Sequence, residues 1–323
     1  MRIAGKLRVY VTTGVLLLAS VSIARAKYSG GSGTAQDPYQ IATAAHRIAL
    51  GETTKNYDKH FILTADIDLD PSLPGRRVFD RAVIAPDVDD QVSGFQGFSF
   101  AGSLDGQAHK IRNLTIRAPD KDYVSLFGCI GKEGRVKKLG VERISITGRS
   151  IVAGIAALSQ GNISSSYSTG NLEGENLIGG LIGANAGTIC STYSTVDAGG
   201  NSHVGGLAGV NEGLISCSYS SGTLTAIQYL KGGFRYALKV GGLVGTTWPS
   251  RGEVKSCFWD TQTSGTAESD GGTGKTTPEM RTAKTFLYAG WDLVGETANG
   301  TQDIWSITEG KDYPRLWWEA TKK

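Results

Sequence analysis

One segment of the sequence resembles a phosphate-binding loop. Residues 271–277 read GGTGKTT, and a Gly-Lys-Thr run before a helix can surround a phosphate with backbone N–H groups and an ammonium. Such a loop requires its first glycine at position 269, where this chain has Ser269, and no apolar strand leads into it. We therefore predict a glycine-rich linker and a helix cap here, with no nucleotide or other cofactor.

Three aspartates near the start of the chain alternate with apolar residues. On a strand, Asp66, Asp68 and Asp70 share one face, and such a row of carboxylates could hold calcium. A calcium loop needs a glycine where this chain has Pro71, so a solvated edge strand whose charges discourage aggregation is favoured. The same alternatives, with the same preference, apply to a second acidic group: Asp87, Asp89 and Asp90. No metal site is predicted.

Carboxylates in the middle of the chain are candidates for catalysis. Enzymes that cleave polysaccharides need clustered carboxylates, and we also expect a basic partner beside them. No Lys or Arg lies between Arg149 and Lys231, and the acidic residues of this region fall at different positions of the repeat described below. These residues are Glu173, Glu175, Asp197 and Glu212. Asp105 is expected in a turn, and His109 and His203 are expected to be structural, so no catalytic residue is predicted.

A repeat with a period of about 26 residues organises the middle of the chain. Tyr167, Tyr193 and Tyr219 recur at this spacing. The same spacing relates three further sets of residues: Ile163, Ile189 and Ile215; Gly161, Gly187 and Gly213; and Asn185 with Asn211. Glycines interrupt each unit, and its β-branched and hydroxyl residues follow a period of two, which indicates strands. Repeats of this length are typical of solenoids.

Stacking such units about 4.8 Å apart pairs their backbones and aligns equivalent residues. The predicted fold is therefore all-β, a right-handed parallel β-helix with coils of about 26 residues. The tyrosines are expected to stack inside the coils, and Asn185 and Asn211 to satisfy backbone groups at turns. The opposite, outer face is expected to carry hydroxyl groups: Ser164, Ser166 and Ser168, then Cys190, Thr192 and Ser194, then Ser216, Ser218 and Ser220.

The repeat divides the chain into four predicted segments. These are a signal peptide at 1–26, an N-terminal cap at 27–94, the β-helix at 95–265 and a C-terminal cap at 266–323. Weaker coils span Phe95–Ile116 and Tyr123–Gly148, and an insertion over Ile227–Tyr236 delays the next coil until Val240.

Both ends are expected to cover the open edges of the solenoid, because uncovered strand edges invite polymerisation. Thr43 can cap a short helix over Ala44–Leu50 that ends before Gly51, and Phe61–Leu69 is predicted to be a strand. Residues 277–279 (TPE) have the pattern of a helix start. The C-terminal cap is expected to be aromatic and to cover the apolar core with Trp291, Trp305, Trp317 and Trp318.

The four cysteines could form disulfides in an exported protein. Cys190 and Cys257 are expected to point outward from coils about 10 Å apart, whereas a disulfide needs Cα atoms within about 7 Å. Cys217 is expected to point inward as a buried free thiol, and Cys129 has no predicted place.

The repeats resemble the GLUG motif, named for its Gly-Leu-hydrophobic-Gly pattern. Three copies are present: Gly180-Leu181-Ile182-Gly183, Gly206-Leu207-Ala208-Gly209 and Gly242-Leu243-Val244-Gly245. Degenerate copies at 125–128 (SLFG) and 154–157 (GIAA) extend the resemblance over about Tyr123 to Gly265. The resemblance implies a repeat found in secreted or surface-attached bacterial proteins, including adhesin-like chains and non-catalytic regions of extracellular peptidases. It also implies that the motif is structural.

The first residues have the pattern of a signal peptide. A basic start is followed by an apolar run from about Val9 to Ile23 and by small residues before a cleavage site at Ala26. The run is too short for a good membrane span, so we predict a secreted or cell-surface protein without a transmembrane segment after cleavage. Its removal leaves a nearly neutral chain, and the lack of basic residues in the repeats argues against nucleic-acid binding.

These features favour a non-enzymatic extracellular protein that uses the long lateral surface of a solenoid, with a glycan or another surface component as its partner. Two alternatives stay open. One is a carbohydrate-active β-helix enzyme, a polysaccharide lyase or hydrolase, with its site in the N-terminal coils or near Tyr229. The other is a surface scaffold without a small ligand. A glycan array separates binder from scaffold, and product release from a polysaccharide would identify an enzyme.

Overall fold

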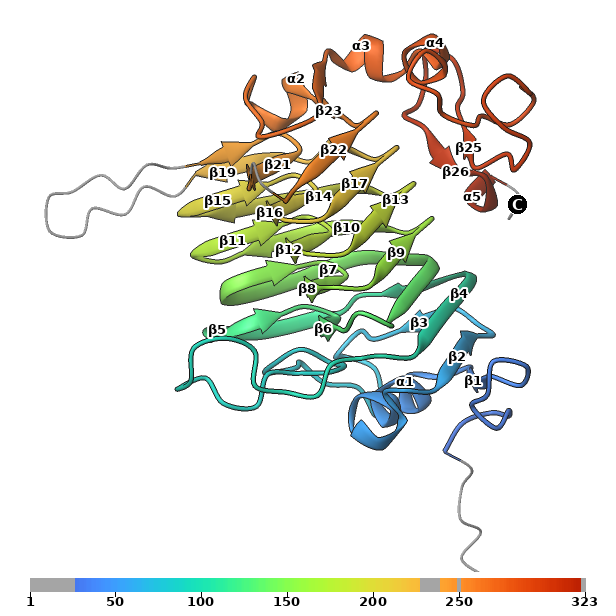
Figure 1. Cartoon of the computed structure of the whole chain (residues 1–323). Coiled ribbons are helices and arrows are strands. Elements are labelled where there is room, and N and C mark those ends of the chain that lie inside the picture. Colours follow the sequence, from blue (N-terminus) through green and yellow to red (C-terminus); the bar gives the residue numbers. More distant parts are fainter. Residues whose placement is uncertain (1–26, 227–238, 249–250, 321–323) are drawn as a thin grey trace, which may run out of the picture.

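A computed structural model describes residues 27–226, 239–248 and 251–320 of the chain. Its parallel strands form a β-solenoid of about seven turns, as the repeat predicted. The coils stack from helix α1 (Ala44–Gly51) at one end to helix α2 (Thr261–Ser264) at the other (Figure 1). The predicted signal peptide and the predicted insertion at 227–236 lie outside the described residues.

The repeat period sets the register of the central coils. Strand β10 (Tyr167–Glu173) pairs in parallel with β14 (Tyr193–Gly200), so that Tyr167 lies opposite Tyr193, and Tyr193 lies opposite Tyr219. Coils nearer the N-terminus are longer than 26 residues. Arg112, for example, lies opposite Glu142, which is 30 residues further along the chain.

The described strands follow one another around the coils. The first are β1 (Tyr39–Ile41), β2 (His60–Leu63), β3 (Ile67–Asp68), β4 (Ser103–Arg112), β5 (Thr115–Val124), β6 (Phe127–Ile130), β7 (Arg135–Ala153), β8 (Ala156–Ser159) and β9 (Asn162–Ser164). Around β10 and β14 lie β11 (Asn176–Gly179), β12 (Ile182–Asn185), β13 (Thr188–Cys190), β15 (Ser202–Gly205), β16 (Ala208–Asn211), β17 (Leu214–Ser216), β18 (Tyr219–Ser220) and β19 (Leu224–Ala226). The next coil contains β20 (Val240–Gly241), β21 (Val244–Thr247), β22 (Glu253–Lys255) and β23 (Phe258–Asp260), and β24 (Thr273–Lys275) stacks on β23 at the start of a further turn.

A left-handed residue shortly before the tyrosine of each central coil changes which side chains point inward. Ser165 has a φ of 44°, and the same conformation recurs in the following coils at Ser191, Cys217 and Ser256. Because this turn interrupts the strand alternation, Ser166 and Ser168 are fully buried and Tyr167 faces outward. The predictions of inward tyrosines and of an outer face built from these serines are therefore wrong. Ser168 donates a hydrogen bond to the carbonyl oxygen of Gly180 inside the coil, at 2.8 Å.

The turn asparagines behave as predicted. The side-chain oxygen of Asn185 accepts from the N–H of Gly187, and that of Asn211 accepts from the N–H of Gly213. The two side chains also bond to each other, with Asn185 donating to Asn211 at 2.8 Å. They form a short ladder along the solenoid axis.

The N-terminal region joins the same ladder of parallel strands. Strand β1 pairs with β2, and β2 pairs with β4, so the ladder already runs before residue 95. Thr43 caps α1 through the N–H of His46, as predicted, but Gly51 is the last helical residue and not the residue after the helix. A Cβ at Gly51 would lie 1.9 Å from the carbonyl oxygen of Val83, which accounts for the glycine. The single strand predicted at Phe61–Leu69 is interrupted between β2 and β3.

The C-terminal region covers the flank of the solenoid as well as its end. After β24 come α3 (Thr277–Met280), α4 (Ala283–Leu287), β25 (Trp305–Ser306), β26 (Arg315–Leu316) and α5 (Trp317–Ala320). Residues 277–279 begin α3, as predicted, and Thr276 caps the helix in a capping box with Glu279. From α4 onward the chain lies beside the upper coils (Figure 1), where Trp291, Trp305 and Trp318 are buried. Three of the tryptophans predicted as a lid therefore pack mainly against the outer side of the coils, and the prediction is wrong for Trp317, which is exposed.

Candidate functional site

The Gly-Leu-hydrophobic-Gly residues build the core of the solenoid. Leu181, Leu207 and Leu243 are fully buried in the same hydrophobic cluster. A Cβ at Gly206 would lie 2.3 Å from the carbonyl oxygen of Gly242 in the next coil. Similar close approaches to the backbone of neighbouring coils surround Gly180, Gly183, Gly209 and Gly245, and Gly242 is closed in by the ring of Trp259. These positions are occupied by glycine because the coils pack tightly there.

The tyrosine column, Tyr167, Tyr193 and Tyr219, stacks as the period predicts but lies on the outer side. The ring centroids are 4.7 Å and 5.1 Å apart, and the rings are nearly parallel. Each hydroxyl donates a hydrogen bond within the chain: Tyr167 to Glu142, Tyr193 to Glu319 and Tyr219 to the carbonyl of Pro314. The column is buried under the C-terminal region, so its hydroxyls are not displayed to a ligand.

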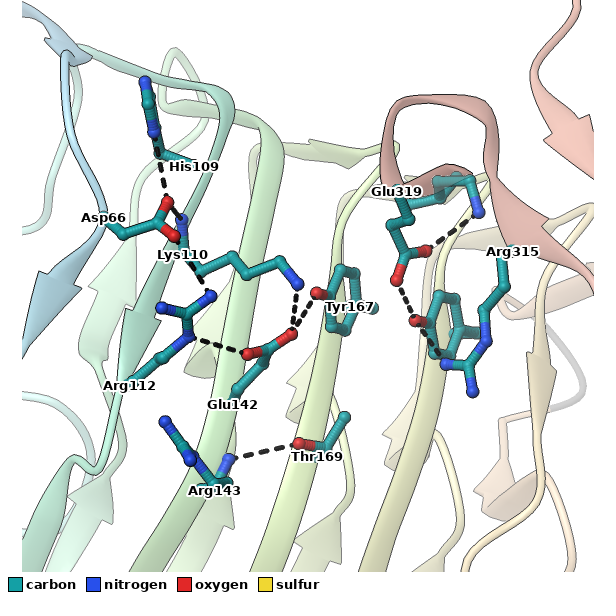
Figure 2. A network of polar contacts seen from close by, with 12 residues as sticks. Asp66, His109, Lys110, Arg112, Glu142, Arg143, Tyr167, Thr169, Arg315 and Glu319 are labelled. Carbon is teal, nitrogen blue, oxygen red and sulfur yellow. Dashed lines mark hydrogen bonds and ion pairs between the residues drawn. The ribbon is translucent and has the colours of Figure 1, made fainter. Parts of the chain in front are cut away.

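A charged network continues this flank toward the N-terminus, and Figure 2 shows its members. At its centre is Glu142 on β7, which contacts Lys110 at 2.8 Å, Arg112 at 3.0 Å and the hydroxyl of Tyr167 at 2.5 Å. Arg112 also pairs with Asp66 at 3.0 Å, and Asp66 contacts His109 at 3.1 Å. The network therefore joins the β2–β3 turn, β4, β7 and β10.

The charges of the network neutralise one another. Burial alone would raise the pKa of Glu142, but hydrogen bonds from Lys110, Tyr167 and Arg112 outweigh it and lower that pKa to about 2. Glu142 is thus ionised near neutral pH and holds no proton to donate as a general acid. The phenol of Tyr167 has its pKa raised by burial and by nearby carboxylates, so it stays protonated. The arrangement suits an ion-pair cluster that ties strands together.

A polar groove opens on the outer face of the same sheet, across β7, β10, β14 and β19, with a volume of about 430 Å³. Ile146, Leu172 and Ala198 point inward and are buried, so their neighbours along each strand face outward. Two rows of residues in register line the groove. One row is Ser145, Asn171, Asp197 and Thr223, and the other is Thr147, Glu173, Gly199 and Thr225.

The groove presents oxygen atoms at regular intervals. Its rows cross four coils, and a coil spacing of about 4.8 Å gives a length of about 14 Å. Hydroxyl and amide groups can donate to and accept from the hydroxyls of a sugar, and carboxylates can accept from them. One oxygen of Asp197 accepts the N–H of Thr223 at 2.8 Å, which fixes the carboxylate in place. The structure thus brings together Glu173 and Asp197, although they occupy different positions of the repeat.

The loop that resembled a phosphate site is part of the ladder. Strand β24 pairs in parallel with β23, and Thr276 caps the following helix. The ammonium of Lys275 lies 3.7 Å from a carboxylate oxygen of Glu279. The predicted helix cap is confirmed, but the predicted linker is wrong, because residues 273–275 form a strand.

The aspartate groups hold neighbouring parts of the chain together. Among the described residues, no group of three or more His, Cys, Asp or Glu side chains is placed to hold a metal ion. Asp68 accepts from Asn113 and from the N–H of Asp70. Strand β3 pairs with β4 and has no second partner among the described strands, so it lies at an edge of the sheet, as predicted. In the second acidic group, Asp87 accepts from two backbone N–H groups and Asp90 pairs with Lys121.

All four cysteines are free thiols. Cys257 is buried and does not point outward, because it follows the left-handed Ser256, and this corrects its predicted orientation. Cys217 is partly exposed rather than fully buried, since it occupies that left-handed position itself. Burial raises the pKa of Cys129 and of Cys257 to about 12, so neither is a reactive thiolate.

The three histidine and aspartate residues set aside as structural have local partners. Asp105 accepts from the N–H of Gln107 in a turn and pairs with Lys137. His109 contacts Asp66, and His203 has a φ of 53° with a ring nitrogen 2.7 Å from the hydroxyl of Ser202.

Sequence reasoning missed Lys110, Arg112 and Glu142. Lys110 and Arg112 are two residues apart on β4 and therefore share a face, which the alternation could have shown. Their partner Glu142 lies 30 residues beyond Arg112, so the shorter period of the central repeat does not align them. The longer N-terminal coils hid the contact.

The fold and the surface define a β-solenoid repeat protein with a polar groove on its flank. No family model matches the sequence. Over 146 residues the chain is 31% identical to halomucin of Haloquadratum walsbyi, and over 142 residues it is 32% identical to a protein of Evansella cellulosilytica provisionally named a Gly-rich membrane protein. The matches cover 44% and 42% of this chain but 2% and 14% of those proteins, so the chain spans a small part of these relatives.

A solved structure shares the fold. It belongs to a Bacteroides ovatus protein provisionally titled an immunoglobulin A1 protease, with a TM-score of 0.53 and 19% sequence identity. The similarity covers 90% of this chain and 96% of that one. Among the described residues of this chain, no helix has the length and apolar character needed to cross a membrane.

Proposed function

We propose that this chain is an exported, cell-surface β-helix protein of the GLUG-repeat, adhesin-like type that binds an extracellular glycan without catalysing a reaction. The observation that carries the proposal is the polar groove, because it repeats hydrogen-bonding side chains in register over four coils of an exposed sheet. A polymer with regularly spaced hydroxyl groups fits such a surface. Export rests on the signal-peptide pattern of residues 1–26.

The relatives support a role at the cell surface. One is named halomucin and the other a Gly-rich membrane protein, and this chain matches a short part of each. A module that occurs within much longer proteins is consistent with a repeat that extends a surface or binds to it.

The charged network supports a non-enzymatic role. Its central carboxylate, Glu142, has three donors within the chain and a pKa of about 2. A hydrolase of the usual kind would need a second carboxyl group that stays protonated to donate to the leaving oxygen. Glu319 has its pKa raised by burial, but it belongs to α5 of the C-terminal region and accepts a hydrogen bond from Tyr193.

A glycan array with the purified protein tests this proposal. We expect hits with dissociation constants on the order of micromolar to millimolar, since the groove is open and polar. Asn171→Ala should weaken binding about tenfold, because its amide lies in the middle of one row. The matched control is Asn162→Ala, on β9 outside the groove, which should bind as the wild type does. Binding that is equal in wild type and Asn171→Ala would place the ligand elsewhere.

The second candidate is a carbohydrate-active enzyme acting at the charged network. The observation that favours it is the gathering of Asp66, His109, Lys110 and Arg112 around Glu142 in the N-terminal coils, where the sequence left such a site open. Incubation with pectin and other polysaccharides, followed by measurement of new reducing ends or unsaturated products, tests it. Turnover that disappears in Glu142→Gln would replace the binding proposal by this one.

A further inference from the structure

The two carboxylates of the polar groove are without basic neighbours in its lining. Glu173 and Asp197 are both exposed, and none of the residues that line the groove is Lys or Arg. Among the described residues, neither carboxylate forms an ion pair. Arg149, which lies on β7 two residues beyond Thr147 and outside the lining, is held by Asp122 through two hydrogen bonds of 2.8 Å and 2.9 Å. The groove is therefore acidic.

The negative charge is concentrated at the centre of the groove. Asp197 on β14 lies opposite Asn171 on β10, and Glu173 follows two residues after Asn171 on the same face. The two ends of the groove carry neutral hydroxyls. These are Ser145 and Thr147 at one end and Thr223 and Thr225 at the other. A ligand along the solenoid axis would meet hydroxyls, then carboxylates and an amide, then hydroxyls again.

We infer that the groove binds an amino-sugar polysaccharide whose amino groups are free and protonated, which rests on the proposed glycan-binding function. An ammonium supplies three donors and a positive charge, which Glu173, Asp197 and the amide oxygen of Asn171 can accept together. One oxygen of Asp197 remains for this purpose after the other has accepted the N–H of Thr223.

The same charges exclude the opposite class of glycan. A uronic acid or sulfated sugar would bring a negative charge beside Glu173 and Asp197 with no basic side chain in the groove to offset it. An N-acetylated sugar keeps the hydroxyls of the ligand but loses the charge. Comparing the three classes at one chain length therefore isolates the contribution of the ammonium.

Calorimetry with the full-length protein and three six-sugar oligomers is the test. The oligomers are β-1,4-linked glucosamine, its N-acetylated form and galacturonate, each measured with a chelator present so that no divalent cation bridges the carboxylates. We expect glucosamine to bind at least tenfold more tightly than the N-acetylated oligomer, and galacturonate to bind least. The preference should fall as salt is added and as the pH rises through the pKa of the amino groups.

Two variants locate the preference. Glu173→Gln with Asp197→Asn should abolish it, and Thr225→Lys should weaken glucosamine binding by placing a cation at an exposed groove position while both carboxylates remain. Glu133→Gln, an exposed carboxylate outside the groove, is the control and should bind like the wild type. Should the double variant misfold, the lysine variant alone decides whether positive charge in the groove opposes the ligand.

The possible outcomes distinguish a failure of the amino-sugar inference from a failure of the proposed glycan-binding function. Equal binding of free and N-acetylated oligomers, or tighter binding of galacturonate, overturns the amino-sugar inference and leaves glycan binding in place. If the protein is folded, as shown by cooperative melting, and binds no glycan class on the array, the proposed function is overturned. Preference for glucosamine that survives in the double variant also overturns the inference, because the groove carboxylates would then not supply it.

Discussion

The strands β10 and β14 carry two different surfaces on one outer face. Their first residues, Tyr167 and Tyr193, are buried under the C-terminal region, while later residues of the same strands line the open polar groove. At the covered end every tyrosine hydroxyl has a partner within the chain. At the open end exposed side chains repeat in register, and no described segment of the chain covers them. The comparison indicates that the covered end stabilises the fold and that the open end is available to a ligand.

The covering segment stops where the tyrosine column stops. The position opposite Tyr167 in the preceding coil is Gly140, where a Cβ would lie 2.8 Å from the tyrosine ring. Trp318 stacks on Tyr167 at 5.5 Å, and beyond it the flank is occupied by the charged network around Glu142. The aromatic C-terminal region, as far as it is described, therefore packs on the aromatic part of the flank and does not cover the charged part.

The largest effect is expected at the covered end. Tyr193→Ala removes a fully buried ring that stacks between Tyr167 and Tyr219 and should lower the free energy of unfolding by about 3–5 kcal/mol. Chemical denaturation measures the change. Tyr288→Ala is the control, because this tyrosine is 80% exposed and its loss should change stability by less than about 0.5 kcal/mol. Similar losses in both variants would show that the C-terminal region does not cover the column.

A smaller effect is expected in the charged network. Glu142→Gln leaves Lys110 and Arg112 without their shared carboxylate and should cost about 2 kcal/mol at neutral pH. Because the folded pKa of Glu142 is about 2, below its usual value of 4.5, its contribution is present above about pH 4.5 and is lost as the pH falls toward 2. Wild type and variant should therefore converge in stability at acidic pH. Glu52→Gln, in an exposed pair with Arg77, should show neither effect.

Glu319 should give a pH dependence of the opposite sign. Burial raises its pKa despite the hydrogen bond from Tyr193 and the charge of Arg315, so its contribution is fully present below its usual pKa of 4.5 and is lost as the pH rises through the raised value. Glu319→Gln removes this titration. Relative to the variant, the wild type should lose stability from pH 4 to 7, by a fraction of the Glu142 effect. Thermal melts across that pH range measure the effect. A difference in stability between wild type and variant that stays constant with pH would contradict a raised pKa for Glu319.

The repeat predicted most of the fold because stacking in register depends on period alone. Tyr167 over Tyr193, the asparagine ladder and the buried leucines of the Gly-Leu motif all follow from the spacing. The facing of the tyrosines did not follow, because it depends on the φ of the residue two positions before each of them. Ser165, Ser191 and Cys217 share no side-chain type that would indicate a left-handed turn. The sequence pattern therefore predicts an unbroken strand alternation, which places the tyrosines inside the coils.

The candidate sites were harder to predict for a related reason. Glu173 and Asp197 occupy different positions of the repeat and meet only because adjacent strands also bring diagonal neighbours together. Glu142 meets Arg112 across a separation of 30 residues, which differs from the period of the central repeat. Contacts between the C-terminal region and the flank, such as Glu319 with Tyr193, span 126 residues and carry no local signal.

The smallest effect on stability is expected in the groove itself. Glu173→Gln replaces an exposed side chain on the outer face of β10 and should change the free energy of unfolding by less than about 0.5 kcal/mol. The same change should reduce glycan affinity, since a charged acceptor in the groove is lost. Denaturation and calorimetry on one preparation measure both quantities. A large loss of stability would mean that Glu173 supports the fold, as Glu142 does, and would remove the distinction between the covered and open ends of these strands.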